Sequence, residues 1–193
     1  MIDLSLGLVA LVALSPVFVL ASLLVFIESG RPIFFRQQRL GRGAKRFTVY
    51  KFRSMSQDAE KMLPEIYDNN EVKDGPIFKW REDPRITRVG RLLRRTSLDE
   101  LPQLINVLLG QMSLVGPRPP LESEVAKYEE WHLRRLSVKP GMTGLWQVSG
   151  RSNLTFAEMV RLDIQYVDNW SLWADLALLA RTPYAVIVAR GAF

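Results

Sequence analysis

The chain has 193 residues, a length that suits one domain or one domain with an appendage. Apolar residues make up 48% of it, which allows a sizeable core and excludes wholesale disorder. The formal charge is +6, and arginine supplies most of the basic side chains. A guanidinium matches phosphate oxygens in pairs, so nucleic acid, an anionic membrane surface and a nucleotide substrate are the candidate partners. The absence of cysteine excludes disulfides, thiolate metal sites and a cysteine nucleophile.

Residues 4–27 carry no charge, and most of them are apolar. A straight helix of this length would measure about 36 Å, against about 30 Å for the hydrocarbon core of a bilayer. Ser15-Pro16 lies at its centre, where proline predicts a kink or break. The segment is therefore a kinked spanning helix or a hairpin that enters and leaves on one side, with a buried core helix as the soluble alternative. Residues 31–53 hold eight Lys/Arg and no acid, which predicts a cytoplasmic body held against anionic headgroups.

Two short strands, over 32–38 and 47–53, are expected next, joined through the Gly-rich residues 40–43. The two-residue period places Lys51 and Arg53 on one face, about 7 Å apart and within reach of one diphosphate. The alternative is a solvated edge strand whose charges prevent pairing with another chain.

The rest of the body is expected to be mainly helical. Asp163 interrupts an apolar helical stripe, and a buried salt bridge is favoured over catalysis there. The lone His132 is expected to be structural, because no second His or Cys could complete a metal site with it. The expected elements are a short helix with a loop over 57–72, an arginine face at Arg88, Arg91 and Arg95, an apolar helical stripe over 101–108 ended by Gly110, an amphipathic helix over 121–136, a Gly-rich loop over 139–151, a helix over 155–169 and an interfacial tail over 172–192.

Asp99 and Glu100 follow an arginine pair and precede the apolar stripe. One interpretation is purely structural: Ser97 and Glu100 would form a capping box, and Pro102 suits a first helical turn. In the other interpretation, a carboxylate held anionic by a helix dipole and nearby arginines is a nucleophile towards phosphorus.

Phosphoryl transfer also needs cations on the non-bridging oxygens. Asp99 and Glu100 together could bind Mg²⁺, which takes one or two carboxylates along with substrate phosphate. The side-chain cations available for the phosphates are Lys51, Arg53, Arg95 and Arg118. No P-loop or G-x-G-x-x-G pattern is present, so a nucleotide would not be bound in those ways.

At these residues the chain closely resembles the monotopic bacterial phosphoglycosyl transferases, the sugar transferases that start exopolysaccharide, capsule and O-antigen assembly. The resemblance covers essentially the whole chain, including the Ser15-Pro16 break. The segments that carry it are Tyr50-Lys51-Phe52-Arg53-Ser54-Met55, residues 96–103, Ser113-Leu114-Val115-Gly116-Pro117-Arg118-Pro119, residues 140–151 and the ending Arg190-Gly191-Ala192-Phe193.

The resemblance implies transfer of a sugar 1-phosphate from a UDP-sugar to undecaprenyl phosphate, with release of UMP. Asp99 and Glu100 match the family's catalytic dyad. Asp99 would form a covalent phosphoglycosyl intermediate, and Glu100 would assist in proton removal, in Mg²⁺ binding or in both. Gln147 and Asp163 are weaker candidates for supporting roles. The ending resembles that of relatives which use UDP-glucose or UDP-galactose.

The overall prediction is an α+β protein of the bacterial inner membrane. Residues 1–30 would form a re-entrant helix broken at Ser15-Pro16, and residues 31–193 a small helix-rich catalytic domain facing the cytoplasm, with a β-hairpin and interfacial amphipathic helices. The chain starts at the membrane segment, so it is expected to be the catalytic part of a longer protein, and a homodimer is left open. A membrane-tethered nucleic-acid binder and a protein that binds the substrates without turnover are the alternatives, and the first is disfavoured because no groove-reading motif is present.

Overall fold

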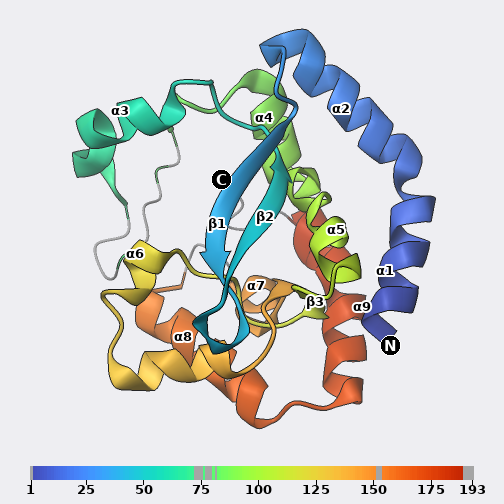
Figure 1. Cartoon of the computed structure of the whole chain (residues 1–193), viewed down its shortest axis with the longest axis vertical. Helices are drawn as coiled ribbons and strands as arrows, with labels where there is room; N and C mark the ends of the chain where they lie inside the picture. The colour runs from blue at the N-terminus through green and yellow to red at the C-terminus, as the bar shows by residue number, and fades with distance from the viewer. Residues whose placement is uncertain (1, 72–75, 77–79, 81, 151–153, 189–193) are drawn as a thin grey trace.

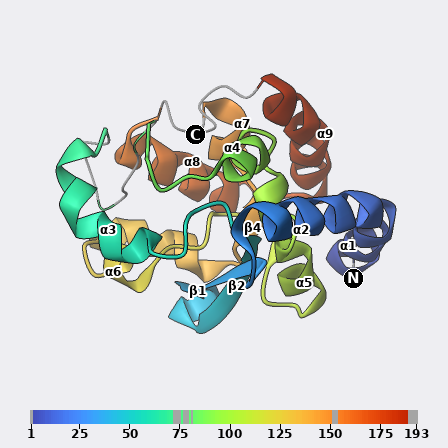
Figure 2. The same ribbon diagram turned by 90° about the horizontal axis from the view of Figure 1, so that it is seen from above.

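A computed structural model describes residues 2–71, 76, 80, 82–150 and 154–188. It shows helices around two small sheets, and Figure 1 places the N-terminal helices along one side of the central β-hairpin. The mixed helix and sheet content agrees with the α+β prediction. Figure 2 shows α1, α2 and α9 towards one end of the molecule and α3 at the opposite end.

The N-terminal segment forms two helices, α1 (Ile2–Ala13) and α2 (Ser15–Ser29), bent by 61°. Pro16 lacks the amide hydrogen that would reach the carbonyl of Val12, and the Ser15 hydroxyl donates to that carbonyl instead, at 2.8 Å. The predicted break is therefore confirmed. None of the described helices is long and apolar enough to cross a membrane alone, whereas this bent pair could do so by length and composition.

Strands β1 (Phe34–Leu40) and β2 (Arg46–Phe52) form the expected antiparallel hairpin, in which Phe34 pairs with Phe52. The turn contains the short 3₁₀ helix η1 (Arg42–Ala44), where Gly43 adopts a φ of 65°. Phe18 of α2 lies 4.9 Å from Phe52, measured between ring centroids. Aromatic packing thus fixes the hairpin against α2.

After the hairpin come α3 (Ala59–Ile66), the 3₁₀ helix η2 (Tyr67–Asn69) and α4 (Arg88–Arg95). The Glu28 carboxylate of α2 accepts the backbone N–H groups of Arg88 and Val89, each at 2.9 Å, and so satisfies two open donors at the start of α4. A Cβ on Gly90 would lie 2.0 Å from the Ser54 carbonyl oxygen, so only glycine allows this close approach of α4 to the chain after β2. These contacts tie α2, β2 and α4 together.

Helix α5 (Gln103–Leu108) covers the predicted apolar stripe and packs on α1, where a Cβ at Gly7 would touch Val107. The chain then enters β3 (Ser113–Val115), which pairs in parallel with β4 (Gly141–Thr143). The main core combines these elements with β2 and the C-terminal helices; it includes Val49, Val107, Met112, Val115 and Tyr166.

Two expectations for the second half are wrong. Residues 121–136 form α6 (Glu122–Val125) and the 3₁₀ helix η4 (Glu130–Ser137) instead of one helix. The backbone N–H of Glu129 donates to Nδ1 of His132, so the chain starts a new helix there and His132 has the expected structural role. Residues 139–150 contain β4 and α7 (Leu145–Ser149) instead of a loop, because β4 pairs with β3 and α7 packs on the last two helices; Arg151 lies outside the described residues.

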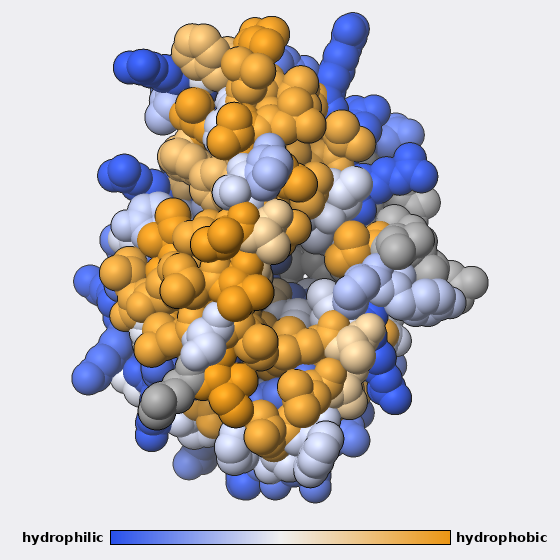
Figure 3. Space-filling view, turned by 90° about the vertical axis from the view of Figure 1, so that its right-hand side faces the viewer, coloured by the Kyte–Doolittle hydropathy of each residue, from blue (hydrophilic) through white to orange (hydrophobic). Residues whose placement is uncertain are grey.

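The last two helices are α8 (Phe156–Asp168), which begins with a capping box between Thr155 and Glu158, and α9 (Leu172–Val188). Figure 3 shows a broad apolar face on the side of the molecule where Figure 1 places α1, α2 and α9. Strongly exposed apolar side chains on these helices include Val9, Val19, Ile27, Trp173 and Tyr184. Most of the tail expected over 172–192 is thus the helix α9, which exposes apolar side chains.

Candidate active site

The two adjacent acids lie in the short 3₁₀ helix η3 (Leu98–Glu100), between α4 and α5. Ser97 precedes them in a left-handed conformation, with a φ of 55°, and its side chain does not cap the helix. The capping-box interpretation of Ser97 and Glu100 is therefore wrong. Asp99 is buried and Glu100 is half-buried. This is an unusual environment for adjacent acids whose role is only to cap the start of a helix.

Lys51 of β2 is the direct partner of this pair. Its Nζ donates to Oε1 of Glu100 at 2.6 Å, and both side chains keep about a third or less of their surface exposed. The hairpin thus carries a cation to the acids from a position 49 residues earlier in the chain.

The surroundings give the two acids different proton affinities. Burial raises the pKa of Asp99 to about 6, an effect that the neighbouring Glu100 charge increases and the Lys51 charge opposes. Burial acts in the same direction on Glu100, but the charge and hydrogen bond of Lys51, followed by the charge of Arg118, lower its pKa below the ordinary value. Glu100 is therefore ionised at neutral pH, and Asp99 is the acid that titrates near neutrality.

Arg118 follows β3 and forms the next layer of the site. Its Nη1 lies 3.1 Å from Oε2 of Glu124, whose side chain is only 4% exposed. Arg39 approaches the same carboxylate at 3.9 Å and donates to the Pro119 carbonyl at 3.1 Å. Two guanidinium groups thus converge on one buried carboxylate beside the dyad.

The other predicted phosphate ligands occupy different surroundings. Arg53 is buried, and its Nη1 has no hydrogen-bond partner among the described residues; burial lowers its pKa. An unpaired buried guanidinium nitrogen is a place where an anion would be bound. Arg95 is exposed at the end of α4, whereas the charge of the adjacent Arg94 acts on Asp99. The structure therefore favours Arg53 over Arg95 as a phosphate ligand.

The two candidates for supporting roles have structural partners. Gln147 donates to the Met142 carbonyl at 2.9 Å, which joins α7 to β4. Asp163 forms an ion pair with Arg135, and each side chain is only 1% exposed, so the expected salt bridge is confirmed. Burial nevertheless raises the pKa of Asp163 to about 6.

Residues that the sequence did not single out also shape the site. Arg39 directly follows the strand expected over 32–38, and Glu124 lies in the helix expected over 121–136. Arg94 belongs to the arginine pair before Asp99, of which only Arg95 is a predicted phosphate ligand. Only the arginine excess and the position of Glu124 just after Pro117-Arg118-Pro119 could have suggested them.

The acids suit a magnesium ion by their chemistry, although no three His, Asp or Glu side chains among the described residues are grouped to hold a metal. Mg²⁺ commonly uses one or two carboxylates and completes its shell with water and substrate phosphate. Lys51 approaches only Oε1 of Glu100, so Oε2 and the Asp99 carboxylate are the candidate ligands. The residues present therefore fit Mg²⁺ only together with a phosphate-bearing substrate.

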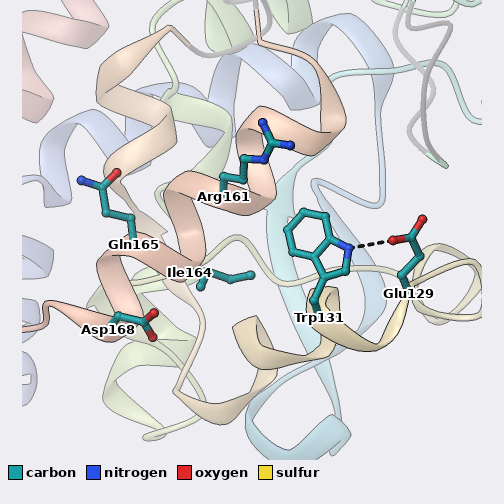
Figure 4. Close-up of a pocket in the computed structure, with 6 residues that line it drawn as sticks. All are labelled: Glu129, Trp131, Arg161, Ile164, Gln165 and Asp168. Atoms are coloured by element: carbon teal, nitrogen blue, oxygen red, sulfur yellow. Dashed lines mark hydrogen bonds between the residues drawn. The ribbon is translucent and has the colours of Figure 1, made fainter.

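Two grooves lie elsewhere on the described part of the chain. Figure 4 shows a groove of about 650 Å³ between η4 and α8, where the indole N–H of Trp131 donates to Glu129 and Arg161 lies opposite. A second groove of about 370 Å³ lies between α1 and α9. Neither contains a predicted site residue, so the candidate site is defined by its charged groups.

Comparisons with known proteins identify the family of the chain. The family model described as "Bacterial sugar transferase" matches residues 1–189. The chain is 49% identical to galactosyl transferase CpsE of Streptococcus agalactiae, over 86% of this chain and 37% of CpsE. It is 42% identical to the exopolysaccharide production protein ExoY of Sinorhizobium fredii, over 99% of this chain and 86% of ExoY. It is 48% identical to an undecaprenyl-phosphate galactose phosphotransferase of Salmonella typhimurium, over 86% of this chain and 36% of that protein.

Proposed function

Since the chain belongs to the bacterial sugar transferase family, we propose that it transfers a hexose 1-phosphate from a UDP-sugar to undecaprenyl phosphate and releases UMP. The observation that carries this proposal is the buried Asp99 beside an ionised Glu100 held by Lys51. The reaction would be an early membrane step in exopolysaccharide, capsule or O-antigen synthesis, in keeping with the name of the relative ExoY. The names of two relatives specify galactose, and we retain glucose as the second donor hexose.

The proposed chemistry has two displacements at one phosphorus atom. In the first, an Asp99 carboxylate oxygen bonds to the β-phosphorus of the UDP-sugar, and the bond from that phosphorus to the bridging oxygen breaks to release UMP. In the second, an oxygen of the lipid phosphate bonds to the same phosphorus and the bond to Asp99 breaks. The product is a sugar diphospholipid, and Asp99 is regenerated as a carboxylate.

The cations around the acids have a role in both steps. Lys51, Arg53 and Arg118 would stabilise charge on the non-bridging phosphate oxygens. A bound Mg²⁺ ion, held by Asp99 and Glu100, would neutralise part of the diphosphate charge. The lowered pKa of Glu100 makes it a poor proton acceptor and a good cation ligand, which favours metal binding over proton removal as its role.

The apolar side of the molecule suits a position at the inner membrane surface. The bent α1–α2 pair and α9 expose apolar side chains on one face (Figure 3), which would enter the cytoplasmic leaflet as a re-entrant anchor. The basic residues of 31–53 would then lie near anionic headgroups. This arrangement would bring the dyad to the depth where a lipid phosphate meets a soluble nucleotide sugar.

The test is UMP release by the purified protein in nanodiscs, with undecaprenyl phosphate, Mg²⁺ and a panel of UDP-sugars. We expect release with a hexose donor, dependent on lipid, and a loss of at least about a thousandfold in Asp99→Asn because an amide cannot act as the nucleophile. Asp58→Asn, a change at an exposed acid on the surface, should leave the rate unchanged. Full activity in Asp99→Asn would refute the covalent step, and no release with any donor would refute the transferase proposal.

A further inference from the structure

Glu124 contacts Arg118 so closely that it restricts where the guanidinium can point. Its Oε2 lies 3.1 Å from Nη1 of Arg118, and its Oε1 lies 3.4 Å from each Nη atom. Oε2 also accepts the backbone N–H of Leu121 at 3.0 Å, so the carboxylate itself is fixed at the start of α6. A bidentate contact with a fixed, buried carboxylate sets both the place and the plane of a guanidinium.

The backbone of Arg118 is held independently. Nη2 of Arg135 donates to the Arg118 carbonyl at 3.4 Å, and the ion pair with buried Asp163 fixes Arg135 in turn. Pro117 and Pro119 on either side restrict the φ angles of the connector. With its backbone fixed, the remaining freedom of Arg118 lies in its side chain, and Glu124 is the group that limits it.

The orientation matters because Arg118 is only partly covered. Its side chain is 26% exposed while that of Glu124 is 4% exposed, so one edge of the guanidinium faces the carboxylate and part of it remains open. Its charge acts on Glu100 of the dyad. Since a guanidinium has five N–H donors, Arg118 can keep its bond to Glu124 and still donate to a phosphate.

We propose that Glu124 is a positioning residue that holds Arg118 ready to bind a phosphate of the sugar-nucleotide donor beside Asp99 and Glu100. The inference rests on the proposed transferase function for the identity of that phosphate. Arg39 approaches the same carboxylate, so the charge of Glu124 also offsets the repulsion between two neighbouring guanidinium groups.

The first test does not depend on activity. Arginine modification by phenylglyoxal, followed at Arg118 by peptide mass spectrometry, should be about tenfold faster in Glu124→Gln because the guanidinium is released. Glu122→Gln is the matched control: Glu122 lies on the same helix, is 64% exposed and pairs with Arg46. It should leave the rate at Arg118 unchanged. An unchanged rate in Glu124→Gln would overturn the proposal.

The second test asks whether Glu124 acts through Arg118. In Glu124→Gln, kcat/KM for the UDP-sugar should fall about tenfold, mainly through KM, and Arg118→Met should lose more. The double variant should be no worse than Arg118→Met alone, whereas losses that multiply would show that Glu124 acts by another route. If Glu124→Gln fails to fold, Glu124→Asp, which keeps the charge but withdraws it by one methylene, should give intermediate reactivity and activity. If the wild type releases no UMP, the transferase proposal fails, while the modification rate still decides the positioning role.

Discussion

Two sides of the molecule differ in which side chains they expose and which they bury. Helices α1 and α2 expose apolar side chains, of which Val19 is 67% and Ile27 is 71% exposed. Glu28, the acid near the end of α2, accepts a hydrogen bond from the N-terminus of α4. The η4 and α8 elements instead bury charge, with Arg135 2% and Asp163 1% exposed. The apolar side chains exposed on α1 and α2 are those that the proposed membrane-bound orientation would place in the bilayer, whereas the ion pair between Arg135 and Asp163 lies in the interior, next to the backbone of Arg118.

The strongest test of this contrast is Asp163→Asn. Removing the carboxylate leaves Arg135 charged and without its buried partner, so we expect a loss of about 3–5 kcal/mol in the free energy of unfolding. Asp168→Asn is the matched control, because the pair between Asp168 and Arg134 joins the same two elements but is largely exposed. It should cost less than about 1 kcal/mol. Equal losses, measured by denaturant unfolding in detergent, would contradict the contrast.

The opposite side is tested by Val19→Asp. An acid at the centre of an apolar helix costs about 2.5–3.5 kcal/mol on entering a bilayer, so binding to vesicles of anionic lipid should weaken about a hundredfold. Stability in detergent should change little, since Val19 is exposed.

Gln165→Glu, which adds a negative charge at an exposed position of α8, should leave vesicle binding nearly unchanged. Vesicle sedimentation measures both variants. Undiminished binding of Val19→Asp would mean that this face does not enter the membrane.

The smallest effect concerns pH. Asp99 must be ionised to attack phosphorus, and its pKa is raised to about 6, so the rate of UMP formation should fall as pH drops through about 6. In Glu100→Gln, loss of the neighbouring negative charge lowers the pKa of Asp99. The rate of UMP formation should therefore begin to fall at a lower pH than in the wild type.

Single-turnover UMP formation without lipid is the appropriate measurement, because a lipid phosphate itself titrates near pH 6. Asp163 also has a pKa of about 6, but it does not contact Glu100. If the rate of UMP formation falls at the same pH in Glu100→Gln as in the wild type, the titrating group is not Asp99.

Sequence patterns correctly predicted the elements that are determined by residues close together in the chain. The Ser15-Pro16 break, the hairpin and the helix expected over 155–169 follow from one proline, an alternation and an apolar stripe at helical spacing. The prediction failed where distant contacts decide. His132 divides the expected helix over 121–136. Within the expected loop, pairing with β3 forms β4, and packing on α8 and α9 forms α7.

The site shows the same limit. Asp99 and Glu100 stood out from their neighbours in sequence, but their different pKa values depend on Lys51, Arg118 and the burial of the pair. The choice between adjacent Arg94 and Arg95 depends on the direction in which each side chain leaves α4. Spacing alone does not show which of the two faces Asp99, because that depends on how α4 packs against its neighbours.

The contact between Glu28 and the start of α4 has a mechanical consequence. A carboxylate on α2 accepts two amide hydrogens of the helix that leads to Asp99, so these two helices are directly linked. In the proposed membrane-bound orientation, a bilayer that thins or thickens would raise or lower the dyad together with its anchor. The height of the reaction above the hydrocarbon would therefore be set by a pair of hydrogen bonds, and lipid composition would act on catalysis through them.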